Sequence, residues 1–209
     1  MTPEISAALI GGLCGVIAAG VTSTLTAKGA SATLLKAEKQ NAQFLAVQVG
    51  PELKRFADDC LSVAFDNGRS LGQPSGENGE CYATASAGEL KLGEISDVAW
   101  RSLPIELMVD LFTFGDKQKA IEAKLAVDPY DDPPYYADFY AERQQDYAKL
   151  GIEAIELGIR LFKETGHTSK LPGAAEVKDQ LAKRLHELQD LQARLAIYRA
   201  SRPTSPFVP

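Results

Sequence analysis

The chain has 209 residues, of which 45% are hydrophobic and 24% are charged, a composition typical of a folded protein rather than a disordered one. This length is enough for one domain with an anchor, or for two very small domains. The formal net charge is −6 and the basic residues are scattered. The charge therefore argues against a nucleic-acid-binding protein, which must neutralise phosphates.

The N-terminal region contains a long apolar run, from Ile5 to Ala27, without a charged side chain. Because about 20 helical residues cross the hydrocarbon core of a bilayer, this run predicts a transmembrane helix within an anchor formed by residues 1–30. A cleaved signal peptide ending at residues 30–32 and a buried helix of a soluble protein are the alternatives. The signal peptide is disfavoured because Glu4 precedes the run without any Lys or Arg, and because the run is too long.

The basic residues near this run predict its orientation. Lys28, Lys36 and Lys39 follow the run, whereas no Lys or Arg precedes it. Positive flanking residues stay in the cytoplasm, so we expect the C-terminal domain to be cytoplasmic. The opposite topology, with an envelope-side domain, is the alternative.

Small residues recur at four-residue steps within the predicted membrane helix, at Gly11, Gly15 and Ala19. This spacing lets two helix backbones approach closely in a membrane. It predicts helix packing through this stripe, by self-association or with a protein partner.

Residues 31–66 are expected to form membrane-proximal helices, with a break or a new helix start at Pro51. Residues 67–93 contain six glycines and Pro74, which favours a Gly-rich loop. A short hairpin around residues 80–84 is the alternative within that loop.

Residues 94–201 are expected to form the core of a helical bundle. The pattern predicts a helix interrupted near Pro104 and ending at Gly115, then a short helix over residues 117–127. Residues 128–134 hold three prolines and must form a turn.

Two long helices complete the predicted bundle. The first runs from about Tyr135 to Thr165, and its wide apolar surface predicts a central position. Gly151 and Gly158 share a face of this helix where another helix could pack closely. The second runs over residues 174–200, with an apolar stripe formed by Val177, Leu181, Leu185, Leu188, Leu191, Leu195 and Tyr198. Residues 202–209 form a Pro-rich tail that we expect to be disordered.

The sequence therefore predicts an all-α fold, in which a single N-terminal transmembrane helix is followed by a bundle of about four or five helices.

No pattern of reactive side chains identifies a catalytic, cofactor-binding or metal site. His167 and His186 lie in different segments, whereas a zinc site needs three or four converging ligands. Cys60 follows two aspartates, which disfavour a reactive thiolate, and Cys81 lies in the loop, where it could be exposed. With Cys14 the cysteines are odd in number, which favours free thiols in a reducing compartment.

A cluster of tyrosines surrounds the proline-rich turn and continues into the long helix, at Tyr130, Tyr135, Tyr136 and Tyr140. Tyrosine is enriched at protein interfaces because it combines apolar area with a polar tip. The cluster predicts either a docking surface or local packing onto the bundle.

Together these patterns favour a non-enzymatic protein that binds membrane lipid through its N-terminal helix and acts as an interaction or scaffold module at the cytoplasmic face. The alternative is a membrane-bound enzyme or metal-binding bundle whose site assembles from distant carboxylates, which sequence patterns alone do not exclude.

Overall fold

The computed structural model describes residues 3–76, 79–92, 100–127, 136–167 and 170–201, with the backbone alone for residues 3–32, 127, 136 and 137. The described helices are α1 (Pro3–Phe65), α3 (Ile105–Val127), α4 (Tyr136–Glu164) and α5 (Ala174–Ser201). Strands β1 (Arg69–Ser70) and β2 (Gln73–Pro74) form a minimal antiparallel hairpin. The prediction of an all-α fold is confirmed, and the ends of α4 and α5 agree with those expected from the sequence.

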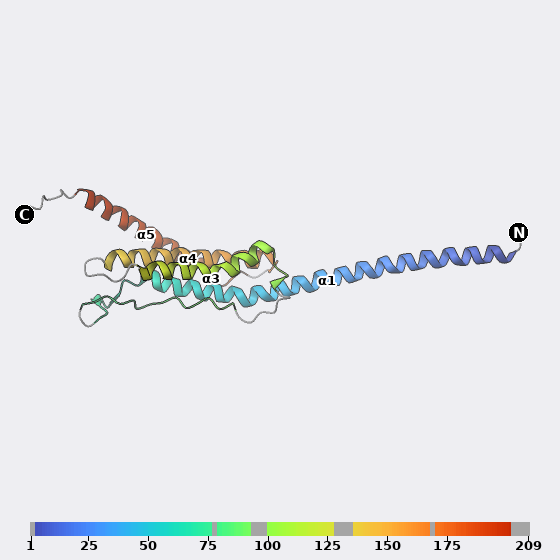
Figure 1. Ribbon diagram of the computed structural model, residues 1–209, viewed down its shortest axis with the longest axis horizontal. Coiled ribbons are helices and arrows are strands. Elements are labelled where there is room, and N and C mark those ends of the chain that lie inside the picture. Colours follow the sequence, from blue (N-terminus) through green and yellow to red (C-terminus); the bar gives the residue numbers. More distant parts are fainter. Residues whose placement is uncertain (1–2, 77–78, 93–99, 128–135, 168–169, 202–209) are drawn as a thin grey trace, which may run out of the picture.

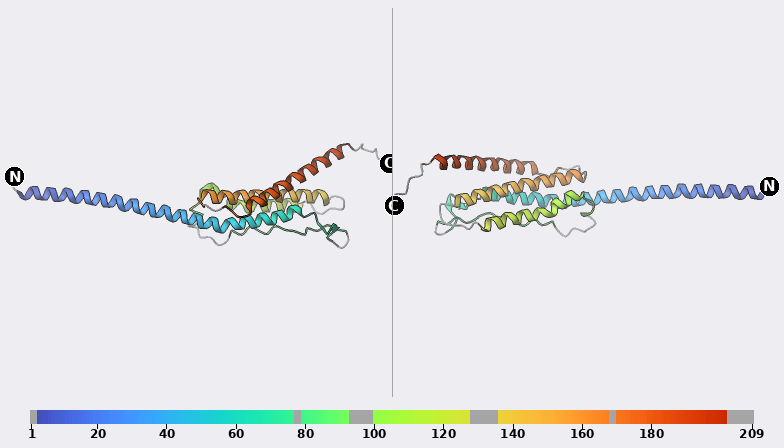
Figure 2. Two further views of the ribbon diagram at one scale, coloured as in Figure 1. Left: turned by 180° about the vertical axis from the view of Figure 1, so that it is seen from behind. Right: turned by 45° about the horizontal axis from the view of Figure 1, so that its top comes forward.

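Helix α4 is the centre of the bundle, since it packs against α1, α3 and α5. Figure 1 shows α1 and α4 side by side, while the N-terminal half of α1 projects beyond the bundle as a rod. The C-terminal half of α5 diverges from the bundle at the opposite end, as both Figure 1 and Figure 2 show. The N-terminal half of α1 and the C-terminal half of α5 therefore lie at opposite ends of the described structure (Figure 1).

The core forms where apolar faces of α1, α3 and α4 meet. Phe56 of α1 and Phe114 of α3 are buried and make an edge-to-face contact with ring centroids 5.6 Å apart. Gly151 of α4 allows a close approach of three helices, because a Cβ there would lie 2.8 Å from both Cys60 and Leu181. This confirms the prediction that a glycine face of the long helix receives another helix.

Helix α1 does not break at Pro51, so the predicted break is wrong. The helix continues through Pro51 to Phe65. Proline removes one backbone hydrogen bond, but burial of residues on both sides, including Val49 and Leu53, holds the backbone in place. Gly50 faces α4 so closely that a Cβ there would lie 2.3 Å from the Phe162 ring. Tertiary packing therefore overrides the local effect of the proline.

Helix α3 also continues where the sequence predicted its end, because Gly115 lies inside it. Gly115 does not have the positive φ of a glycine that ends a helix. The buried positions Leu111, Phe114 and Gln118 keep the helical spacing through the glycine. One helix therefore replaces the two that the pattern indicated.

The predicted loop between residues 67 and 93 is irregular in its described parts, apart from the β1–β2 hairpin. That hairpin lies at residues 69–74 and not at residues 80–84, where the sequence suggested one. Its turn residues Leu71 and Gly72 both have positive φ, 51° and 79°, as a tight two-residue hairpin turn requires. Residues 79–92 then return along α1 toward the start of α3 (Figure 1).

Among the residues with described side chains, no helix has a segment long and apolar enough to cross a bilayer. The predicted membrane segment, Ile5 to Ala27, lies outside those residues, as do the predicted turn over residues 128–134 and the tail over residues 202–209. The backbone of residues 3–32 is helical and continuous with the rest of α1.

Candidate functional site

The most buried polar cluster lies at the C-terminal end of α1 and is centred on Asp66, which is 5% exposed. Its Oδ2 accepts from the backbone amides of Thr84 and Ala85 at 2.8 and 3.0 Å. Its Oδ1 accepts from the Thr84 hydroxyl and from the amide of Gly68 at 2.8 and 3.0 Å. We call this cluster, with Arg143 and Gln144 of α4, the Asp66 junction.

Arg143 supplies the positive charge of the junction. Its guanidinium lies 2.9 Å from Asp66 Oδ2, and the side chains of Arg143 and Asp66 are 9% and 1% exposed. The same guanidinium donates to the backbone carbonyl of Ala85. Burial by itself would raise the pKa of the Asp66 carboxyl, but the donors of Ala85, Gly68, Thr84 and Arg143 outweigh it and hold that pKa below its ordinary value.

Three side-chain hydrogen bonds tie the junction to its surroundings. Gln144 donates to the Asp66 carbonyl at 2.8 Å, and Arg184 of α5 donates to the Ala64 carbonyl at 2.9 Å. Tyr140 donates its hydroxyl to the Cys81 carbonyl at 3.1 Å. The Ala64 carbonyl in the last turn of α1 thus receives a donor from α5, and the Asp66 carbonyl just after the helix receives one from α4. The junction fixes the irregular segment against the bundle, and its carboxylate is fully used in doing so.

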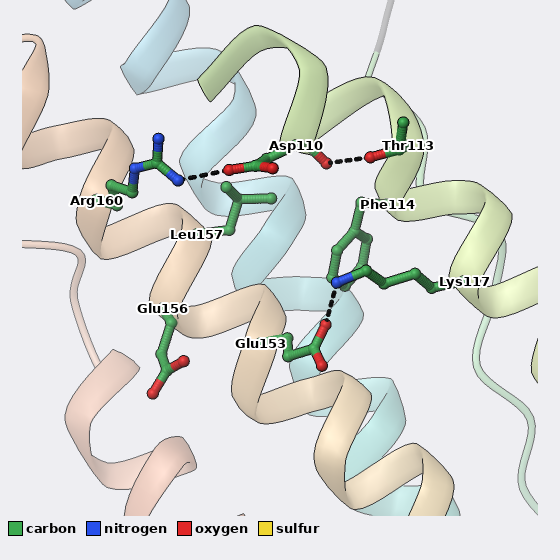
Figure 3. Close-up of a pocket in the computed structure, with 8 residues that line it drawn as sticks. All are labelled: Asp110, Thr113, Phe114, Lys117, Glu153, Glu156, Leu157 and Arg160. Carbon is green, nitrogen blue, oxygen red and sulfur yellow. Dashed lines mark hydrogen bonds and ion pairs between the residues drawn. The ribbon is translucent and has the colours of Figure 1, made fainter. Parts of the chain in front are cut away.

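A charged groove of about 300 Å³ lies between α3 and α4, and Figure 3 shows its lining. Lys117 bridges to Glu153 at 2.6 Å across one end, and Arg160 bridges to Asp110 at 2.5 Å across the other. The floor is apolar, formed by Phe114 and Leu157. Glu164 and Asp110 raise the pKa of the Arg160 guanidinium.

Each carboxylate that lines this groove is paired with a cation. Glu156, the third of them, lies 2.8 Å from Lys178 of α5. The charges of the three carboxylates are therefore balanced by Lys117, Arg160 and Lys178. These ion pairs connect three helices, and we interpret them as interhelical contacts.

A second hollow of about 430 Å³ opens where α5 diverges from α4, and we call it the α4–α5 wedge. At the outer end of the wedge, the guanidinium of Arg199 on α5 lies 3.0 Å from the carboxylate of Asp138 on α4. Lys124 enters from α3 and pairs with Glu142 and Asp146, whose carboxylates raise the pKa of its ammonium group. The remaining lining residues are Gln145, Lys149, Gln192, Leu195 and Ala196.

Gln145 marks the wedge as incompletely packed. The residue is 9% exposed, and its Nε2 atom is buried without a hydrogen-bond partner among the described residues. Leaving a buried donor unpaired costs about 1–3 kcal/mol. Since native proteins hold few such groups, the wedge differs from the well-satisfied Asp66 junction.

The reactive side chains considered in the sequence lie apart from one another. Cys60 is fully buried in the core, where burial and then Asp59 raise the pKa of its thiol. Cys81 is buried as well, at 6% exposure, so the expectation that it could be exposed is wrong. Both are free thiols. His186 lies 3.6 Å from Asp190 on the surface of α5, while His167 packs edge-on against Phe162.

In the described part of the chain, no three His, Cys, Asp or Glu side chains converge as metal ligands would. The membrane-helix stripe at Gly11, Gly15 and Ala19 lies where only the backbone is described.

Only one member of the tyrosine cluster has a described side chain. Tyr140 is 3% exposed and belongs to the Asp66 junction, as the local-packing interpretation expected for it. The side chains of Tyr130, Tyr135 and Tyr136 lie outside the described residues, so their proposed docking role stays a prediction.

Neither the Asp66 junction nor the wedge was predicted from the sequence. Asp66 and Arg143 are 77 residues apart, so no local spacing connects them. The available signal was the sequence Asp66-Asn67-Gly68 at the end of an apolar helix pattern, which indicates a chain reversal stabilised by side-chain hydrogen bonds. Comparison of the chain with protein-family models, curated proteins and solved structures finds no match.

Proposed function

We propose that this chain is a single-pass membrane protein whose helical bundle acts as an interaction or scaffold module at the cytoplasmic face. The observation that carries the proposal is the unbroken α1. This one helix, Pro3–Phe65, contains the apolar run at its N-terminal end and a main element of the core at its C-terminal end. A membrane anchor that is continuous with the core holds the bundle rigidly, without a flexible linker.

The middle of α1 sets the distance between membrane and bundle. Residues 33–40 are all exposed, and burial begins with Ala42. From Lys28 to Ala42 the helix rises about 21 Å at about 1.5 Å per residue. The bundle would therefore stand clear of the lipid headgroups, with its surfaces open to partners.

The cytoplasmic orientation is supported by Lys28, Lys36 and Lys39, which lie between the apolar run and the bundle. The free, buried thiols of Cys60 and Cys81 are compatible with a reducing compartment.

The scaffold role is supported by apolar side chains on the outside of the bundle. On α3, Ile105, Val109 and Phe112 are 65%, 50% and 54% exposed, at the spacing of one helical face. Grouped exposed apolar residues are typical of surfaces that bind a partner.

Charged substitutions in the apolar run test membrane anchoring. We expect Leu13→Arg with Ile17→Arg to release the chain from membranes washed with alkaline carbonate, because each Arg at a helix centre costs about 2.5–3.5 kcal/mol of insertion free energy. The matched control is Leu34→Arg with Leu35→Arg, since both leucines are 65% exposed on the rod.

The control variant should remain in the membrane pellet like the unmodified chain. Recovery of the unmodified chain in the soluble fraction would contradict the proposal, as would retention of the Leu13→Arg, Ile17→Arg variant.

A further inference from the structure

The outward face of α1 carries large apolar side chains where the helix enters the bundle. Phe44 and Val47 are 60% and 51% exposed, whereas Leu45 and Ala46 between them are fully buried. Ala37, one step further toward the N-terminus on the outward face, is exposed as well. At its entry into the bundle α1 therefore presents one face to the core and the opposite face to the outside.

This outward face is free of charge over a long stretch of α1. Its spacing of three and four residues continues from the bundle back into the apolar run as far as Gly11, and every position on it is uncharged. Residues 28–40 follow the same rule although four of them are charged. Lys36 lies at the edge of the face, and Lys28, Glu38 and Lys39 lie on the far side of the helix.

The face stays on one side of α1 because its average step is close to the turn of an α-helix. Gly11, Thr22, Thr33 and Phe44 follow one another at intervals of 11 residues, which is close to three turns at about 3.6 residues per turn. Two helices with this repeat can lie against each other over a long distance with only slight supercoiling.

We propose that this face pairs with the same face of a second copy of the chain, so that two α1 helices run parallel from the membrane to the bundle. The direction rests on the proposed function, because two copies anchored by the same helix in one membrane point the same way. In such a pair each residue faces its own counterpart, and a charge on the shared face would oppose a like charge. A face without charge meets this condition, which a different partner chain would not impose.

The length of the face is sufficient for a stable contact. From Gly11 to Val47 the helix rises about 54 Å at about 1.5 Å per residue, and a helix is about 10 Å wide. Pairing over this length would cover roughly 500 Å² of each copy, or roughly 1,000 Å² in total, the size expected of a biological interface. Small residues such as Gly15 let the backbones approach closely in the membrane, and Phe44 adds buried apolar area in water.

Disulfide linking of the full chain in isolated membranes tests the pairing. Ala37→Cys and Gln40→Cys lie on the proposed face, and Leu35→Cys and Lys39→Cys are the matched controls, since all four residues are exposed in the same part of α1. With copper phenanthroline as the oxidant, we expect at least about tenfold more linked dimer at the face positions than at the controls. Only residues on the shared face of two paired helices approach each other.

The introduced thiol is the one available for linking in these variants. All of them carry Cys14→Ala, and the thiols of Cys60 and Cys81 are buried. The same membranes are washed with carbonate, and linking is measured in both the pellet and the soluble fraction. A soluble chain would contradict the proposed anchor, whereas the linking pattern decides the pairing by itself.

A charge on the face should prevent the pairing. Ala37→Glu should reduce linking through Gln40→Cys at least about tenfold, because it places two carboxylates opposite each other. Leu35→Glu, on the other side of the helix, should leave that linking unchanged. Equal linking at face and control positions would overturn the pairing, as would the absence of linked dimer from both fractions.

Discussion

At the scale of single residues, the Asp66 carboxylate connects parts of the chain that lie far apart in sequence. It accepts from backbone or side-chain donors of Gly68, Thr84, Ala85 and Arg143. A buried ion pair is stable only when its remaining hydrogen-bonding positions are filled, and here they are. The irregular residues 79–92 have little regular structure of their own, so this carboxylate is a main reason that they stay against α1.

Replacing this carboxylate should destabilise the fold strongly. We expect Asp66→Asn to lower the free energy of unfolding by about 3 kcal/mol, because the substitution leaves the buried Arg143 charge unpaired. The control is Asp58→Asn, since Asp58 is 44% exposed and pairs with Lys54 at 2.6 Å. An exposed ion pair contributes about 0–1 kcal/mol. Urea denaturation measures the free energy of unfolding of both variants. Equal decreases in the two variants would show that the buried ion pair stabilises the fold no more than an exposed one.

The same group should make stability depend on pH in the acid range. Its folded pKa lies below the ordinary 3.8, so the carboxylate stabilises the fold above that pH, and the contribution is lost as pH falls through the folded value. The difference in unfolding free energy between the unmodified chain and Asp66→Asn should therefore be full near neutral pH and shrink below pH 3.8. A difference that stays constant from neutral pH into this acid range would refute the assignment.

At the scale of the helices, two glycines that both lie inside a helix differ in what surrounds them. Gly151 lies where α1 and α5 meet α4, whereas a Cβ at Gly115 would have no described atom within 4 Å. Both residues lie inside helices. The difference comes from what packs against each helix.

Alanine substitution should separate the two positions. We expect Gly151→Ala to destabilise the chain by about 1–3 kcal/mol, because the added methyl group overlaps Cys60 and Leu181. Gly115→Ala should stabilise it by about 0.5–1 kcal/mol through helix propensity alone. Thermal unfolding monitored by circular dichroism checks both. A stabilised Gly151→Ala variant would mean that the three helices do not approach so closely.

The helices themselves could be predicted from sequence because their apolar residues repeat at helical spacing. The bounds of α4 and α5 followed from long periodic stretches, and Gly151 was recognised by its seven-residue spacing from Gly158. The helix breaks that were wrongly predicted at Pro51 and Gly115 have one cause. Local residue preferences disfavour a helix at these positions, but burial of the residues on both sides keeps the backbone helical. The Asp66 junction depends on a contact between Asp66 and Arg143, which are 77 residues apart. The spacing of apolar residues within one helix does not predict such a contact.

At the scale of the whole molecule, the bundle is built on one end of a helix that extends far beyond it. Figure 1 shows the N-terminal half of α1 and the divergent end of α5 at opposite ends. With the N-terminal end in a membrane, the wedge and the β1–β2 hairpin would face away from that membrane.

The central claim is that this bundle is held at the cytoplasmic face by its N-terminal helix. Fusions at Pro209 in a bacterial host test it directly, with a fluorescent protein that matures in the cytoplasm and a phosphatase that is active only after export. We predict a fluorescent fusion that remains in carbonate-washed membranes and a phosphatase fusion without activity. An active phosphatase with a dark fluorescent fusion would reverse the orientation, and fluorescence recovered in the soluble fraction would contradict the anchor itself.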